Sequence, residues 1–336
     1  METLINVTSV EKNYYSAKET HGAMEWCKQL IWPSYVSFQV LSGVSFNISK
    51  GAAVGFIGPN GAGKSSLIKI LCGIQKPTSG SVRIFGYDPA LREKNFLNQI
   101  GVVFGHKTSL WWDLPVETSF ETYKEIYNIK DADYCERLSE LSEALNLGKI
   151  LHKPVRNLSL GERVKCELTL NLLHSPKLIF LDEPTVGLDV TSKYEIRKYL
   201  NYKRSRDNLS IFLTSHDFGD IESCCDGAII IDSGKIRFDG SMRELSGNFK
   251  ANVKLTVTTL DPDPCGGELM GVKQAMEAFQ SVGIISDGQN QLTYRVPKEL
   301  LGAVFDRFQG GIYCLEVSPM DFESNVVDLF KTWSGE

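Results

Sequence analysis

The segment GPNGAGKS at residues 58–65 constrains the fold of this chain more than any other feature. It fits the pattern G-x-x-x-x-G-K-[ST], in which glycines let the backbone turn tightly and bring its N–H groups against phosphate oxygens. The apolar run 53–57 predicts a buried parallel strand, and residues 66–72 predict a helix whose start attracts anions. This order predicts an α/β sheet with a phosphate site at one edge.

The loop also indicates a nucleoside triphosphate bound with Mg²⁺. Lys64 carries a charge suited to the β- and γ-phosphates, and the hydroxyl of Ser65 is suited to Mg²⁺. A glycine-rich turn that binds nothing is the alternative, and it is disfavoured because every required position is filled between a strand and a helix. The residues expected to contact the nucleotide are Gly58, Pro59, Asn60, Gly61, Ala62, Gly63, Lys64, Ser65 and Ser66.

A second apolar run, residues 178–182, ends in a carboxylate. In an open α/β sheet, a buried strand delivers the residue at its carboxyl end to the ligand crevice. Asp182 is therefore predicted to bind Mg²⁺ directly or through water, and Glu183 to act as the general base for the attacking water. An acid pair at a strand end is often part of a plain loop, but the phosphate loop upstream favours the catalytic interpretation.

The segment LSLGE at residues 158–162 lies ahead of this acidic strand. Ser159 and Glu162 have the spacing of a capping box that begins a helix. The same helix start, with its serine hydroxyl, is also an anion site that could hold a γ-phosphate presented by another subunit. The two interpretations are compatible.

Two shorter segments extend this pattern. Asp189 follows the acid pair, and His216 follows the apolar run 209–213. A lone histidine after a strand is more often structural than catalytic. His216, however, follows the next strand of the predicted sheet, where it could reach the same phosphate crevice.

Together, these motifs resemble the nucleotide-binding subunits of ABC transporters over about residues 4–245. Residues 58–65 resemble Walker A, Asp182 with Glu183 resembles Walker B and its catalytic glutamate, and residues 158–162 resemble the family signature. The resemblance implies an ATPase that binds ATP and Mg²⁺ and works as a sandwich dimer, homomeric or heteromeric. It implies that the partner-facing signature residues are Ser159, Gly161 and Glu162.

Further roles come from the resemblance alone. Asp189 matches the interfacial aspartate, His216 the switch histidine, and Tyr14 the aromatic residue that stacks on adenine. The segments VFG at 103–105 and WWDLP at 111–115 are similar to ATPases of two-component exporters. That similarity implies a separate integral-membrane permease, export as the direction of transport, and a peripheral position on the cytoplasmic face of the membrane. The cargo, read by the permease, is not encoded in this chain.

The sequence departs from the family pattern at two places. The signature has Leu160 and Glu162 where the family commonly has glycine and glutamine, although Ser159 and Gly161 are kept. His106 stands where the family normally has the glutamine that touches Mg²⁺ and the attacking water. Imidazole is a softer ligand than an amide oxygen, and magnesium prefers oxygen. His106 is therefore an uncertain metal ligand, and we expect slow hydrolysis that falls below about pH 6.5 as it protonates.

Composition limits the function classes. The net charge of −5 offers no global basic field for nucleic acid, so no nucleic-acid partner is expected. The chain has no apolar run of membrane-spanning length and does not open on a signal peptide, which predicts that another chain supplies the channel. The eight cysteines lack zinc-site spacing.

The chain is predicted to form an α/β P-loop ATPase domain over residues 1–247 and a small α+β domain over 248–336. Strands are expected at 4–10 and 43–49, and between them residues 23–31 have helical apolar spacing. That apolar face could pack on its own domain, contact a permease or lie on a membrane surface. A helical subdomain is expected within about 105–160. Trp111 and Trp112 at its start either pack in the core or fill a partner's pocket.

The pattern of the last 90 residues is β-α-β-β-α-β, with helices at 269–281 and 298–309 and a final helix at 321–332. This is the split βαβ pattern of ferredoxin-like domains. Fold alone assigns it no role.

Three function classes remain open. The favoured one is an ATPase subunit that couples ATP hydrolysis to a permease. The second, motivated by His106, is a catalytically weak subunit that binds ATP and completes another ATPase's site. The third, an ABC ATPase acting on nucleic acid or ribosomes, is disfavoured by the single cassette and the lack of a basic tail.

Overall fold

The computed structural model describes residues 2–17, 35–105, 107–215, 217–247, 252–259, 273–274, 276, 279, 282–287, 291–307, 313–320 and 322–334. It divides into two compact units, Met1–Arg243 and Glu244–Glu336. The expected domain boundary at residue 247 lies close to this division and stays a prediction. The apolar helical pattern at 23–31, His106 and His216 lie outside the described residues.

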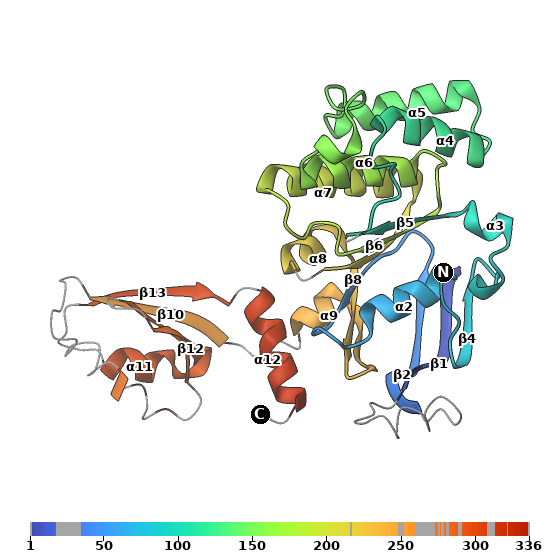
Figure 1. Cartoon of the computed structure of the whole chain (residues 1–336). Helices are drawn as coiled ribbons and strands as arrows, with labels where there is room; N and C mark the ends of the chain where they lie inside the picture. Colours follow the sequence, from blue (N-terminus) through green and yellow to red (C-terminus); the bar gives the residue numbers. More distant parts are fainter. Residues whose placement is uncertain are drawn as a thin grey trace, which may run out of the picture. The chain divides into compact units, whose positions relative to one another are not determined.

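The centre of the first unit is a six-stranded sheet in the order β5-β6-β7-β3-β8-β9 (Figure 1). Pairing is parallel from β5 to β8, and β9 joins β8 antiparallel. The inner strands are almost wholly buried, which explains their continuous apolar sequence. The strands are β3 (Ala53–Ile57), β5 (Ile100–Phe104), β6 (Leu178–Asp182), β7 (Ser210–Thr214), β8 (Gly227–Asp232) and β9 (Lys235–Ser241).

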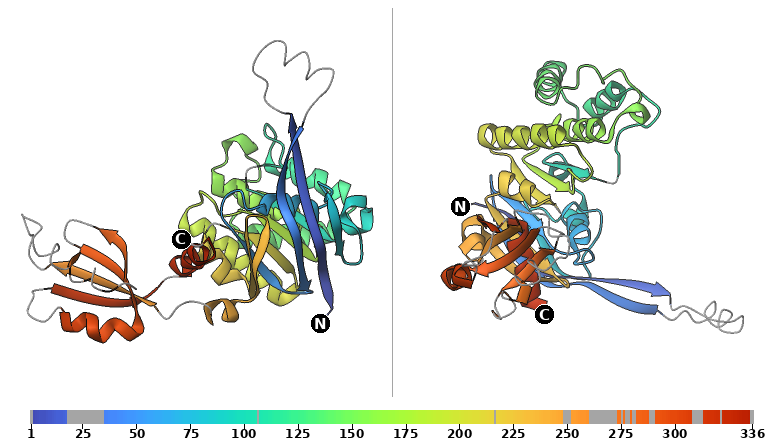
Figure 2. Two further views of the ribbon diagram at one scale, coloured as in Figure 1. Left: turned by 90° about the horizontal axis from the view of Figure 1, so that it is seen from below. Right: turned by 90° about the vertical axis from the view of Figure 1, so that its left-hand side faces the viewer.

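A second, antiparallel sheet has the order β2-β1-β4, with β1 at Thr3–Ala17, β2 at Tyr35–Ser49 and β4 at Ser79–Ile84. The expected strands at 4–10 and 43–49 are correct in type but too short. Beyond Val10 the two strands continue as a paired ribbon to Ala17 and Tyr35. This ribbon projects from the unit in Figure 2. The apolar side chains of the ribbon, among them Tyr15, Val36 and Phe38, are exposed, so the alternation of a half-buried strand does not mark it.

Helices surround the six-stranded sheet. The helical subdomain consists of α4 and α5, joined to α6, which leads into β6 (Figure 1). The core between the sheets is aromatic, with the rings of Phe56 and Phe212 5.4 Å apart. The helices of this unit are α2 (Lys64–Leu71), α3 (Lys94–Leu97), α4 (Val116–Ile126), α5 (Asp131–Ala144), α6 (Leu160–Leu172), α7 (Val190–Asp207) and α8 (Phe218–Cys224), with 3₁₀ turns at Pro89–Leu91 and Val155–Asn157, and α9 (Met242–Gly247) follows β9.

The second unit contains a four-stranded antiparallel sheet in the order β11-β12-β10-β13. This order is what two interleaved βαβ units produce, with each crossover skipping one strand. The ferredoxin-like assignment nevertheless stays a proposal, because the expected first helix at 269–281 is described only in part. The elements are β10 (Asn252–Thr259), β11 (Gly283–Asp287), β12 (Gln291–Pro297), a 3₁₀ turn (Lys298–Leu300), α11 (Leu301–Arg307), β13 (Tyr313–Pro319) and α12 (Phe322–Ser334).

Candidate ATP site

The phosphate loop connects β3 to α2, as expected from its sequence. Gly61 and Gly63 have φ of 83° and 106°, a region that favours glycine. A Cβ added to Gly58 would lie 2.5 Å from the carbonyl oxygen of Ile231, whereas space in front of Gly61 is open. The loop is therefore packed against β8 on one side and free on the other, where a phosphate could approach.

Lys64 is 6% exposed and lies under this loop. Its ammonium group donates to the carbonyl oxygens of Gly58 at 2.6 Å and Pro59 at 3.1 Å. Burial lowers the pKa of Lys64, while the charges of Glu183 and Asp182 act to raise it. A buried cation within the field of two carboxylates suits an anionic ligand with a bridging cation.

Glu183 follows β6 in an unusual conformation, with φ of 53°. Its N–H donates to the carbonyl oxygen of Thr214 at 3.0 Å and to the Thr214 hydroxyl at 3.1 Å. The same hydroxyl donates to Asp182 at 2.7 Å. Thr214 therefore fixes both acids of the predicted Walker B segment from the neighbouring strand.

These groups meet at a cavity of 280 Å³. The described residues that line it are Val40, Asn60, Gly61, Gly63, Lys64, Ser65, Ser66 and Glu183. Tyr14 lies beside it on β1, half-buried, with its hydroxyl 3.1 Å from that of Ser66 and donating to Gln75 at 2.6 Å. The ring that the resemblance assigns to adenine is therefore held next to the phosphate loop.

Ser159, Gly161, Glu162 and Asp189 form a separate group. Ser159 is the N-cap of α6 and completes the predicted capping box, because Glu162 N–H donates to its hydroxyl at 3.2 Å and its own N–H donates to Glu162 at 2.7 Å. Asp189 caps α7 and accepts from the Ser192 N–H at 2.9 Å. A Cβ on Gly161 would lie 2.6 Å from the Ser192 hydroxyl, so only glycine allows the two helix starts to meet.

Sequence reasoning missed two buried acids. Glu167 of α6 is 4% exposed, and it accepts from the N–H groups of Ser109 at 2.6 Å and Leu110 at 3.3 Å and from the hydroxyl of Thr108. Burial raises its pKa. It ties the loop after position 106 to the signature helix. The sequence pattern that could have indicated Glu167 is its position three residues after Val164, on the buried face of α6. Asp220 of α8 is the second such acid.

Trp111 and Trp112 are 46% and 48% exposed, so core packing does not account for them. The Arg163 guanidinium lies 5.8 Å from the Trp112 ring centre. Position 106 directly follows Gly105, whose N–H donates to the Asp182 carbonyl oxygen at 2.8 Å. Gly105 therefore lies beside the predicted Walker B acid.

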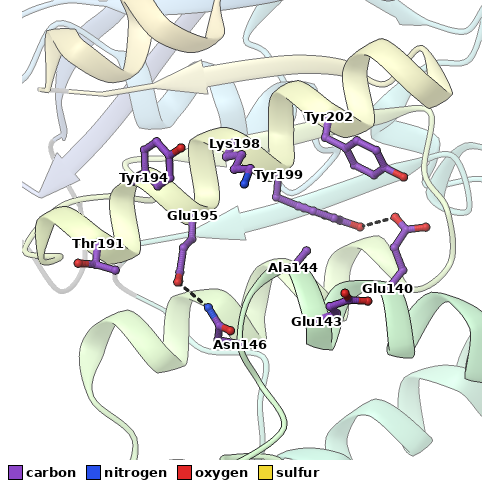
Figure 3. Close-up of a pocket in the computed structure, with 10 residues that line it drawn as sticks. All are labelled: Glu140, Glu143, Ala144, Asn146, Thr191, Tyr194, Glu195, Lys198, Tyr199 and Tyr202. Atoms are coloured by element: carbon purple, nitrogen blue, oxygen red, sulfur yellow. Dashed lines mark hydrogen bonds between the residues drawn. The ribbon is translucent and has the colours of Figure 1, made fainter.

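A larger cavity of 660 Å³ lies between α5 and α7 and contains none of the predicted site residues (Figure 3). Two of its acidic side chains accept hydrogen bonds from neighbouring residues. Tyr199 donates to Glu140 at 3.1 Å, and Asn146 donates to Glu195 at 2.6 Å (Figure 3). Lys203 and Arg206 also pair with Glu140.

The described residues include no helix long and apolar enough to cross a bilayer. Among the same residues, no cluster of three histidine, cysteine or acidic side chains could by itself hold a metal ion. The chemistry of the predicted set still fits Mg²⁺, since Ser65 offers a hydroxyl oxygen and Asp182 a carboxylate, and nucleotide phosphates commonly supply further ligands.

Comparison with known proteins agrees with the site. A model of the ABC transporter family matches residues 41–186. The ABC transporter ATP-binding protein NatA of Bacillus subtilis is 29% identical over 60% of this chain and 82% of its own length. This chain covers only 16% of the length of several longer curated relatives.

Two solved structures share the fold. The structure of an ATP-binding subunit of an ABC transporter aligns with a TM-score of 0.62 and 25% identity, covering 73% of this chain and 93% of the other. A dimeric, post-hydrolysis ATP-binding cassette bound to ADP and Pi aligns with a TM-score of 0.60 and 22% identity, covering 71% and 99%. The predicted fold class is confirmed for the ATPase domain, whereas the fold of the C-terminal domain stays a prediction. The chain binds ATP and is an enzyme of the ATPase class. Residues 41–186 therefore lie in an ABC transporter ATP-binding domain.

Proposed function

We propose that this chain is the ATP-hydrolysing subunit of an export-type ABC transporter and acts on the cytoplasmic face of a membrane with a separate permease chain. The observation that carries the proposal is the cavity at the phosphate loop, which collects Lys64, Ser65 and Glu183 around an open glycine turn. The finer similarity of WWDLP to two-component exporters supports the direction of transport and the separate permease.

Each residue has a role in this proposal. Lys64 neutralises the β- and γ-phosphates, and the phosphate-loop N–H groups orient them. Ser65 and Asp182 would hold Mg²⁺, which would neutralise charge that develops on the phosphates. Glu183 accepts a proton from the attacking water, and His216 contacts the γ-phosphate. Tyr14 stacks on the adenine.

The second half of the site comes from another subunit. Ser159, Gly161 and Glu162, with Asp189, lie outside the described lining of the 280 Å³ cavity. Exposed apolar side chains surround them, with Val190 84%, Val186 40% and Leu160 37% exposed. This face suits a second ATPase subunit whose γ-phosphate would meet the start of α6.

The test uses the purified chain. Turnover of ATP with Mg²⁺ and ATP-dependent dimers in sedimentation are expected, together with capture of a polytopic membrane protein from detergent extracts. A chain that binds ATP without turnover, and forms dimers only with a second ATPase, would instead match the catalytically weak subunit that His106 favours. Recovery of RNA or ribosomes without a membrane protein would contradict both.

A further inference from the structure

One buried carboxylate accepts hydrogen bonds from three segments of the first unit. Asp220 in α8 is 1% exposed. One of its oxygens accepts from the Ser215 hydroxyl at 2.8 Å and from the Thr185 hydroxyl. The other accepts from Nε of Arg197 in α7 at 2.6 Å. These donors come from the end of β7, from the loop after Glu183 and from α7, so the carboxylate is a common anchor for all three.

The Ser215 hydroxyl extends this anchor along the chain. It accepts from the N–H of Asp217 at 2.9 Å while donating to Asp220. The carboxylate of Asp217 in turn accepts from the Gly219 N–H at 2.9 Å and pairs with Lys193 and Arg197. Burial acts to raise the pKa of Asp217, but these two cations outweigh it and hold that pKa below its ordinary value. The residues on both sides of position 216 are therefore fixed by the same network.

Thr185 links the anchor to Glu183, the proposed general base, which lies two residues earlier. Glu183 has φ of 53°, which is strained for a non-glycine residue and persists only where neighbours hold it in place. On its amino side Glu183 is held by Thr214. On the C-terminal side of Glu183, the hydroxyl of Thr185 donates a hydrogen bond to Asp220.

We propose that Asp220 is a positioning residue, which holds the segment after Glu183 and the segment around position 216 in one fixed arrangement for hydrolysis. It does not belong to the described lining of the phosphate cavity, so it acts through these segments. The inference rests on the proposed function. It predicts that weakening the anchor lowers kcat, because the general base is misplaced, and leaves ATP binding intact, because the phosphate loop is untouched.

Ser215→Ala tests the anchor, with Ser210→Ala as its matched control. Both serines are buried. Ser210 begins β7, whereas Ser215 directly follows its last residue. At its end of the strand, Ser210 accepts from the Gly51 N–H at 2.8 Å. We expect Ser215→Ala to lower kcat by about 10- to 100-fold with KM for ATP within about twofold. Ser210→Ala should leave both constants unchanged. Equal effects of the two changes, or an effect on KM alone, would overturn the proposal.

Thr185→Val supplies an independent variant, since valine keeps the shape of threonine and removes only the hydroxyl. It should lower kcat as Ser215→Ala does. Because both hydroxyls bond the same oxygen of Asp220, the double variant should lose less than the product of the two single losses. Strict additivity would contradict a shared anchor. Asp220→Asn is a weaker choice, because it leaves Arg197 without its buried partner and risks unfolding.

Amide hydrogen exchange separates this inference from the proposed function. In Ser215→Ala, exchange should rise at residues 185–188 as well as at Asp217, since the anchor links the two segments. Faster exchange confined to Asp217 would overturn the proposal even if the wild-type chain hydrolyses ATP. A wild-type chain without turnover would refute the proposed function, and the exchange pattern would still decide the anchor.

Discussion

The two halves of the ATP site are built differently. In the phosphate-loop half, Lys64, Ser65 and Glu183 line a cavity, and the charges of Glu183 and Asp182 act on the buried Lys64 cation. The signature half, Ser159, Gly161, Glu162 and Asp189, has polar groups already bonded at two helix starts. Ser159 and Glu162 satisfy each other, and Asp189 accepts from the N–H and hydroxyl of Ser192.

The electrostatics of the two halves also differ. Burial lowers the pKa of Lys64, whereas hydrogen bonds lower the pKa of Glu162, chiefly from the Ser159 N–H, and of Asp189, chiefly from the Ser192 hydroxyl. The signature half thus keeps two ionised carboxylates near the place where a γ-phosphate is proposed to dock. Attraction there must come from N–H groups and the helix start. The comparison implies that the phosphate-loop half can bind a nucleotide in the monomer. The signature half would contact a nucleotide only in a dimer.

The largest effect is expected from Glu183→Gln. Loss of the general base should lower turnover by about 10²–10⁴ while ATP binding persists, because the loop and Lys64 are unchanged. The variant should accumulate as an ATP-bound dimer in sedimentation. Lys64→Ala is the matched contrast within the same half, and it should lose ATP affinity itself. Wild-type turnover in Glu183→Gln would remove Glu183 from the catalytic role.

Ser159→Arg should separate the two halves. The bulky cation would occupy the phosphate position on the partner-facing side, so ATP-dependent dimers should disappear while monomer ATP affinity stays nearly intact. Ser205→Arg is a suitable control, because this exposed serine lies near the opposite end of α7 from Asp189, about 24 Å away at 1.5 Å per residue. Unchanged ATP-induced dimers in Ser159→Arg would count against the sandwich arrangement.

The sequence predicted much of both halves because each depends on local rules. The glycine loop between a strand and a helix and the Ser159–Glu162 box need only neighbouring residues, and both were confirmed as structures. The parts that were missed depend on distant residues. The tie from Thr214 to Asp182 and the anchor at Asp220 join segments about 30 residues apart in the sequence, which no local pattern encodes.

A smaller effect is expected at position 106, where the sequence departs from its family. Gly105, the residue before it, donates to the Asp182 carbonyl oxygen. An amide oxygen is a better ligand for Mg²⁺ than imidazole. His106→Gln should therefore raise turnover and flatten the loss of rate below about pH 6.5. Superimposable rate profiles of the two proteins from pH 5.5 to 8.5 would refute this role for His106.

The smallest effect tests the charge of the signature half. In Glu162→Gln the amide oxygen can accept the same bond from the Ser159 N–H, so the melting temperature at pH 7 should change by less than about 2 °C. The lowered pKa of Glu162 means that its stabilising effect is complete above its ordinary pKa and is lost as the pH falls through the folded value. The variant lacks this loss, so its melting temperature relative to wild type should rise between pH 6 and pH 3. Glu136→Gln, at an exposed position of α5, controls for removal of one carboxylate. If the two variants show the same pH dependence, the charge of Glu162 plays no part in the box.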